Sequence, residues 1–249
     1  MPLFERYIGV EYSGAKIPES SLFGLRIYVA DSTNPPHAVE PPASTRTHWT
    51  RRGAAEWLCK ELAKDIPAIV GIAHAFSFPV EYFEKFSLPL DWPKFLDDFQ
   101  KHWPTDDSST DVDSVRYGSC GQGSQRMGDV RWLRLTERCT VNTKSVFHFD
   151  VQDSVAKATH AGLPWQRYLR HECKRSIHFW PFDGWDVPYG SSVVAEVYPS
   201  LWTRRFANGS RNGNSQAAFA VAAWLHSVDV NRSLPHFLNP VPRHNPVRL

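Results

Sequence analysis

Several patterns that would indicate a class of protein at once are missing from this sequence of 249 residues. It has no apolar run of about eighteen residues, so no segment is expected to span a membrane. Its first residues, Met-Pro-Leu-Phe-Glu-Arg, lack the apolar region of a secretory signal. We therefore expect a cytoplasmic protein with no membrane partner.

Cysteine is scarce, and its four positions are scattered. Cys59, Cys120, Cys139 and Cys173 form no C-x-x-C pair. This spacing argues against a zinc site and provides no disulfide framework. We expect buried or idle thiols.

Neither the net charge nor any short catalytic motif identifies the class of protein. The formal net charge is only +2, which does not indicate a nucleic-acid binder, although charge biased to one region would still allow one. The sequence contains no P-loop, G-x-S-x-G, H-E-x-x-H or dinucleotide-binding glycine pattern. The enzyme classes that those motifs identify are not expected.

The first third of the chain has the pattern of an α/β protein. Residues 7–12 and 22–30 predict two strands that pair antiparallel. Residues 37–40, between two proline pairs, predict a short edge strand or an extended segment. Residues 50–66 have helical spacing, with Thr47 or Thr50 as the N-cap. The unbroken apolar run 68–73 then predicts a strand buried on both faces, which is typical of parallel sheets.

The middle of the chain, about 79–140, differs from the first third in composition. It predicts one short helix over 94–102, followed by an acidic stretch, 106–113, and a glycine-rich stretch, 118–128. We interpret this region as an insertion within a single domain of residues 1–249. Its polar stretch is either a lid-like loop or an ordinary surface loop.

The last part of the chain predicts further helices and strands. The expected helices are 150–170 (kinked or divided at Pro164), 199–206 and the apolar 216–228, and the expected strands are 176–182 and 192–197.

Two carboxylates stand at the ends of predicted strands. Glu11 precedes the Ser13-Gly14 turn, and Glu196 follows Val194-Ala195 and precedes Tyr198-Pro199. A carboxylate there is either a solvent-facing edge residue or a group that faces a crevice, where open α/β sheets bind ligands. His74, directly after the buried strand, is either a structural histidine or a ligand or acid–base group.

Other candidate residues lie on helices. Asp150, Asp153, Lys157 and His160 share one helical stripe, which is either a solvated face or a place where Lys157 and His160 contact a phosphate or water. The pairs Arg51-Arg52 and Arg204-Arg205 are the best candidates for phosphate contacts, although charged helix ends are common.

Four blocks of sequence together resemble the DUF429 family of predicted nucleases in the ribonuclease H-like superfamily. They are Ile8–Ala15 (IGVEYSGA), Gly71–Pro79 (GIAHAFSFP), Glu196–Trp202 (EVYPSLW) and Ala217–Leu225 (AAFAVAAWL), in the order that the family shows. The resemblance implies a mixed sheet whose first three strands are antiparallel, with helices on both faces. It also implies converging carboxylates that hold Mg²⁺ or Mn²⁺ for hydrolysis of a phosphodiester.

The sequence departs from this family pattern at two acidic positions. Ala73 and Ala217 stand where the family has Asp, and Glu11 stands where it usually has Asp. Only Glu11 and Glu196 remain as metal ligands, with His74, Asn214 and Gln216 as neighbours that could partly substitute.

Two main hypotheses follow. The first is a metal-dependent nuclease in which Glu11 and Glu196 bind Mg²⁺ or Mn²⁺ and Lys157 and His160 contact substrate or water. In it, Ser13, Arg52, His74 and Arg204 complete the substrate site. The second is an inactive relative that binds nucleic acid, DNA or RNA, or serves as a scaffold. A hydrolase of small phosphorylated molecules is a third and weaker hypothesis.

Overall fold

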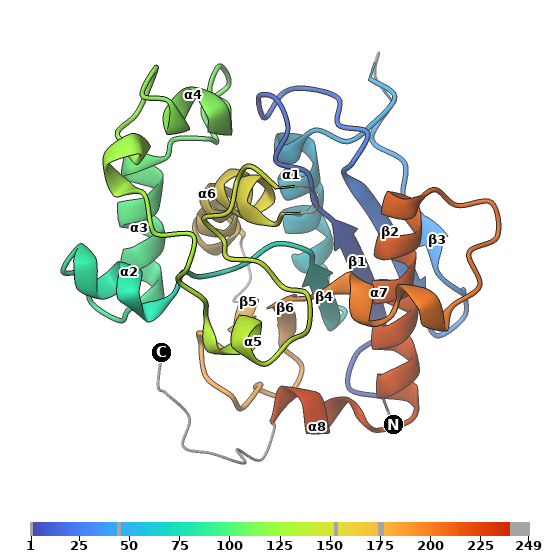
Figure 1. Cartoon of the computed structure of the whole chain (residues 1–249). Helices are drawn as coiled ribbons and strands as arrows, with labels where there is room; N and C mark the ends of the chain where they lie inside the picture. Colours follow the sequence, from blue (N-terminus) through green and yellow to red (C-terminus); the bar gives the residue numbers. More distant parts are fainter. Residues whose placement is uncertain (1, 44–45, 152–153, 174–176, 240–249) are drawn as a thin grey trace.

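One mixed sheet forms the centre of the molecule (Figure 1). The computed structural model describes residues 2–43, 46–151, 154–173 and 177–239. In the described chain the sheet has six strands in the order β3-β2-β1-β4-β6-β5. β1, β2 and β3 are antiparallel, and β4, β6 and β5 run parallel to β1. The predicted α/β class with three antiparallel first strands is therefore confirmed. The strands are β1 (Arg6–Glu11), β2 (Arg26–Asp31), β3 (His37–Ala38), β4 (Ala68–Ile72), β5 (Ile177–Trp180) and β6 (Ser192–Glu196).

Helices cover both faces of this sheet. α7 (Gly213–Val230) packs on β1 and β2 from one side. On the other side, α1 (Arg51–Leu62) and α6 (Ala156–Glu172) contact each other and share the main hydrophobic core with β1 and β4. α8 (Leu234–Leu238) extends the α7 side. In Figure 1, α7 is orange to red and α6 is yellow.

Small residues allow α7 to lie unusually close to the sheet. Gly9, Gly71 and Ala195 are level with one another in the register of β1, β4 and β6. A Cβ atom added at Gly9 would lie only 2.1 Å from the backbone oxygen of Ala218 in α7. This close approach brings the first turns of α7 to the end of β1.

The predicted insertion is packed into the main core. It forms α2 (Val80–Lys85), α3 (Trp92–His102), α4 (Val112–Arg116), the 3₁₀ helix η1 (Gly123–Arg126) and α5 (Leu135–Arg138). α3 packs against α6, and Phe78 contacts Phe95, Phe99 and Phe147. Within the acidic stretch, the Asp111 carboxylate accepts a hydrogen bond from the Ser114 backbone N–H and caps α4. The lid-like interpretation of this stretch is therefore not favoured.

Two helix predictions were wrong in detail. The helix expected over 150–170 begins at Ala156 and continues through Pro164 without division. Asp150 lies before it and pairs with Arg116, and Asp153 lies outside the described residues. The helix expected over 199–206 is replaced by two short 3₁₀ helices, η2 (Pro199–Leu201) and η3 (Thr203–Arg205).

The prediction of buried or idle thiols was wrong for two of the four cysteines. Cys59 in α1 and Cys173 at the end of α6 form a disulfide, whereas Cys120 and Cys139 are free. The two bonded residues are 114 positions apart in the sequence, so their spacing gave no indication of the pairing. The packing of α1 on α6 brings them together. Among the described residues, no helix has both the length and the apolar character needed to cross a membrane.

Candidate functional site

A cleft opens where β1, β4 and β6 end. Parallel strands end at one edge of a sheet, so the residues that follow them lie close together. Glu11, Ala73, Glu196 and Ala217 all line this cleft, which has a volume of about 410 Å³. The four positions that the DUF429 resemblance singles out therefore converge at one place.

Glu11 is a partly buried carboxyl group without a cation beside it. Arg26 is opposite Glu11 in the register of β1 and β2, but its guanidinium donates to the backbone oxygen of Leu25. Among the described residues, no group donates a hydrogen bond to the Glu11 carboxylate. Burial raises the pKa of Glu11 to about 8, since water no longer stabilises its charged form. At neutral pH the protonated form of Glu11 predominates.

Glu196, in contrast, is held by a guanidinium. Nη1 and Nη2 of Arg134 each donate a hydrogen bond of 2.7 Å to the Glu196 carboxylate, and the Phe76 backbone N–H donates a third of 2.9 Å. Burial by itself would raise the pKa of Glu196. Arg134 and the hydrogen bonds outweigh burial and hold that pKa below its ordinary value.

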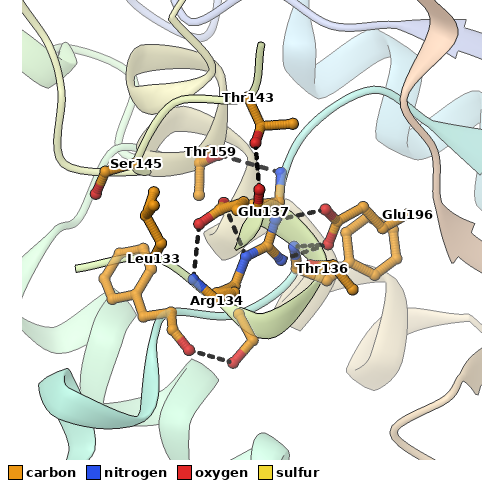
Figure 2. A network of polar contacts seen from close by, with 12 residues as sticks. Leu133, Arg134, Thr136, Glu137, Thr143, Ser145, Thr159 and Glu196 are labelled. Atoms are coloured by element: carbon orange, nitrogen blue, oxygen red, sulfur yellow. Dashed lines mark hydrogen bonds and ion pairs between the residues drawn. The ribbon is translucent and has the colours of Figure 1, made fainter. Parts of the chain in front are cut away.

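Glu137 contacts the same guanidinium from its other side (Figure 2). Nε of Arg134 donates a hydrogen bond of 3.0 Å to Oε1 of Glu137, and the Arg134 backbone N–H donates to Oε2 at 2.9 Å. The side chains of Glu137 and Arg134 are only 5% and 14% exposed. Burial alone would lower the pKa of Arg134, but the two carboxylates raise it above its usual range.

His74 lines the cleft as a neutral, structural group. His74 is 1% exposed, and burial lowers its pKa to about 4. Nδ1 lies 2.9 Å from the Ala75 carbonyl oxygen and Nε2 lies 3.2 Å from the amide nitrogen of Gln166. Both ring nitrogens therefore have partners, Nδ1 as donor and Nε2 as acceptor.

The outer walls of the cleft are rich in uncharged polar groups. One wall comes from α5 and the segment after it, and another comes from the start of η2 and η3. Hydroxyl and amide side chains on these walls are Thr136, Thr140, Asn142, Thr143, Ser154, Tyr198, Ser200 and Thr203. Such side chains both donate and accept hydrogen bonds.

The residues at the cleft do not fit the divalent metal site that the family resemblance implies. In the described chain no group of three or more His, Cys, Asp or Glu side chains is arranged to hold a metal ion. Alternation along the strands places Glu11 on the α7 side of the sheet and Glu196 on the opposite side. The Glu196 carboxylate is also already occupied by Arg134. Gln216 offers no substitute, because its amide bonds Arg211 and two backbone oxygens.

Lys157 and His160 lie away from the cleft. Lys157 forms an ion pair with Asp113 of α4. His160 is fully buried, with its ring centroid 4.4 Å from that of Trp103, and burial lowers its pKa to about 3. His160 lies in the core because α3 and α4 cover the face of α6 that carries this stripe. The predicted contact of these two residues with substrate or water is therefore not supported.

The other predicted substrate residues divide into two groups. Ser13 and Arg52 do not border the cleft: the Ser13 backbone oxygen accepts a hydrogen bond from Arg51, and Arg52 pairs with Glu19. Arg204 is exposed in η3, directly after the cleft residue Thr203. Ser13 likewise directly follows a cleft residue, Tyr12, so Ser13 and Arg204 each adjoin the cleft lining in sequence, whereas Arg52 does not.

Arg134 and Glu137 were not among the candidate residues predicted from the sequence. Their only signal is a spacing of three residues, which allows a side-chain pair at the start of a helix. That signal is weak in a region for which the sequence predicts an insertion and only one short helix, over 94–102. Comparison with known protein families, with curated proteins and with solved structures found no match to this chain.

Proposed function

We propose that this chain is a relative of the ribonuclease H-like nucleases that binds a nucleotide unit of nucleic acid in its cleft without cutting it. The single observation that carries this proposal is the set of four positions around the cleft. Two hold alanine, one holds a carboxylate paired to Arg134, and the fourth holds Glu11, which has no cation beside it.

The strand order supports the ribonuclease H-like part of the proposal. The antiparallel β1, β2 and β3, followed by β4 parallel to β1, match the sheet that the DUF429 resemblance implies. The position of Glu11, Ala73, Glu196 and Ala217 at one edge agrees with the same resemblance.

The chemistry of the cleft supports a nucleotide as its ligand. A volume of about 410 Å³ is in the range of sites for small molecules. The charges of Glu137 and Glu196 balance those of Arg134 and Lys144, and Glu11 is mostly protonated at neutral pH. A nearly neutral cleft with many hydroxyl groups suits a base and a sugar. The exposed Arg204 and Arg205 near its wall suit the adjoining phosphates.

The test combines binding with cleavage. Labelled short DNA and RNA strands are titrated with the protein in EDTA and, separately, in Mn²⁺, with fluorescence anisotropy for binding and gels for cleavage. We expect binding in both buffers and intact strands. Arg204→Gln should reduce the slope of affinity against salt concentration by about one ion, whereas the control Lys101→Gln on α3 should not.

Metal-dependent hydrolysis is the second candidate function, because Glu11 and Glu196 do share the cleft. Cleavage in Mn²⁺ that is lost in both Glu11→Gln and Glu196→Gln would establish it and overturn our proposal. The absence of any binding to DNA, RNA or mononucleotides would overturn the proposal as well.

A further inference from the structure

The guanidinium of Arg134 lies between two acidic side chains at the edge of the sheet. It donates three hydrogen bonds to them, two to Glu196 and one to Glu137. Figure 2 shows the two carboxylates on different edges of the same planar group. Carboxylates that share one buried cation in this way resemble the ligands of a bound metal ion in charge, although not in geometry.

Both carboxylates are fixed independently of the guanidinium. The Phe76 backbone N–H, which follows β4, donates to Glu196. Glu137 is anchored by the Arg134 backbone N–H and by its place in α5, where its own carbonyl oxygen accepts a hydrogen bond of 2.6 Å from the Thr143 hydroxyl. Removal of the guanidinium alone would therefore leave two acidic groups near their present positions.

We infer that Arg134 is the resident cation of this cleft, and that Glu196 and Glu137 form a latent divalent-cation site which its guanidinium keeps closed. The inference rests on the proposed function in one respect, because it explains why a bound strand stays intact. Its physical basis is charge: the buried Glu137 and the partly buried Glu196 need a cation nearby, and Arg134 supplies it permanently. A metal ion would have to displace a group that is covalently part of the protein.

The direct test is Mn²⁺ binding to purified variants at pH 8, measured by isothermal titration calorimetry and by electron paramagnetic resonance of free Mn²⁺. Wild-type protein should show no specific binding. Arg134→Gln removes the charge and keeps a polar side chain, and it should bind one Mn²⁺ at least about tenfold more tightly than the wild type. Adding Glu137→Gln to that variant should remove most of the gain.

Two control variants separate this effect from a general loss of positive charge. Arg138→Gln removes a neighbouring arginine of α5 that pairs with Glu81 instead of the cleft carboxylates, and it should behave as wild type. Arg134→Lys keeps a cation and should also remain without specific Mn²⁺ binding. The inference is wrong if Arg134→Gln binds Mn²⁺ no better than wild type, or if Arg138→Gln gains as much.

A measurement on the wild-type protein does not depend on any variant folding. When Mn²⁺ is added, the NMR signals of the Arg134 Nε–H and the Glu196 carboxyl carbon should keep their line widths. Selective broadening of either signal would place Mn²⁺ at the closed site and overturn the inference. The proposed function is tested separately, by anisotropy for strand binding and by gels for strand cleavage. Neither of these assays measures the affinity of the protein for Mn²⁺.

Discussion

Replacement of Glu11 by Gln should stabilise the protein in a way that depends on pH. The carboxyl group has a folded-state pKa of about 8, against an ordinary value of 4.5, because the fold removes water from it without providing a cation. An acid with a raised pKa favours folding when it is protonated. The contribution of Glu11 is therefore fully present below pH 4.5 and is lost as the pH rises toward 8. Glutamine cannot ionise, so the variant avoids this loss.

The size of the effect follows from the same interval. Each pH unit between the two pKa values corresponds to about 1.4 kcal/mol, which sets an upper bound of about 5 kcal/mol. Glu11 is partly exposed at the cleft, and contact with solvent reduces the free-energy contribution of a shifted pKa. We expect Glu11→Gln to gain about 1–3 kcal/mol in free energy of unfolding at pH 8 and close to nothing at pH 4.5.

Urea denaturation at several pH values between 4.5 and 9, in buffers with EDTA, measures this gain. The control is Glu84→Gln, which removes an exposed carboxylate of α2 and should show little change with pH. A Glu11→Gln variant whose difference from wild type stays constant across this range would refute the reasoning. A variant that is less stable than wild type at pH 8 would show that the ionised carboxylate has a stabilising partner.

Three further outcomes are expected. Gly9→Ala should destabilise the protein by about 3 kcal/mol or more, because its Cβ would meet the Ala218 oxygen and push α7 from the sheet; thermal unfolding measures the loss. Reduction of the Cys59–Cys173 disulfide should lower the free energy of unfolding by about 4–5 kcal/mol, because the bond restricts the unfolded chain across a separation of 114 residues. Equal urea midpoints with and without reductant would contradict this. Lys157→Met should change stability by less than about 1 kcal/mol, since the pair is exposed, and should leave the affinity for DNA and RNA unchanged in the anisotropy assay.

The places where sequence-based prediction failed have a common physical cause. Lys157 and His160 share a stripe on one helix, and periodicity alone cannot show whether solvent or another helix covers it. In the folded protein α3 and α4 pack there, so His160 enters the aromatic core. In the same way, the pairing of Cys59 with Cys173 depends on how α1 crosses α6, which no local pattern records.

The sequence by itself determined the strands and their order of appearance, because alternation and unbroken apolar runs are local properties of the chain. It also placed Glu11 and Glu196 at strand ends, and parallel strands bring such ends to one edge. Only the tertiary structure decided the charge at that edge. Arg134 comes from a segment far from β6 in sequence and reaches Glu196 only once the insertion has packed on the core. Glu11 therefore faces a cleft in which the guanidinium of Arg134 holds Glu196. The carboxyl group of Glu11 itself is largely protonated at neutral pH.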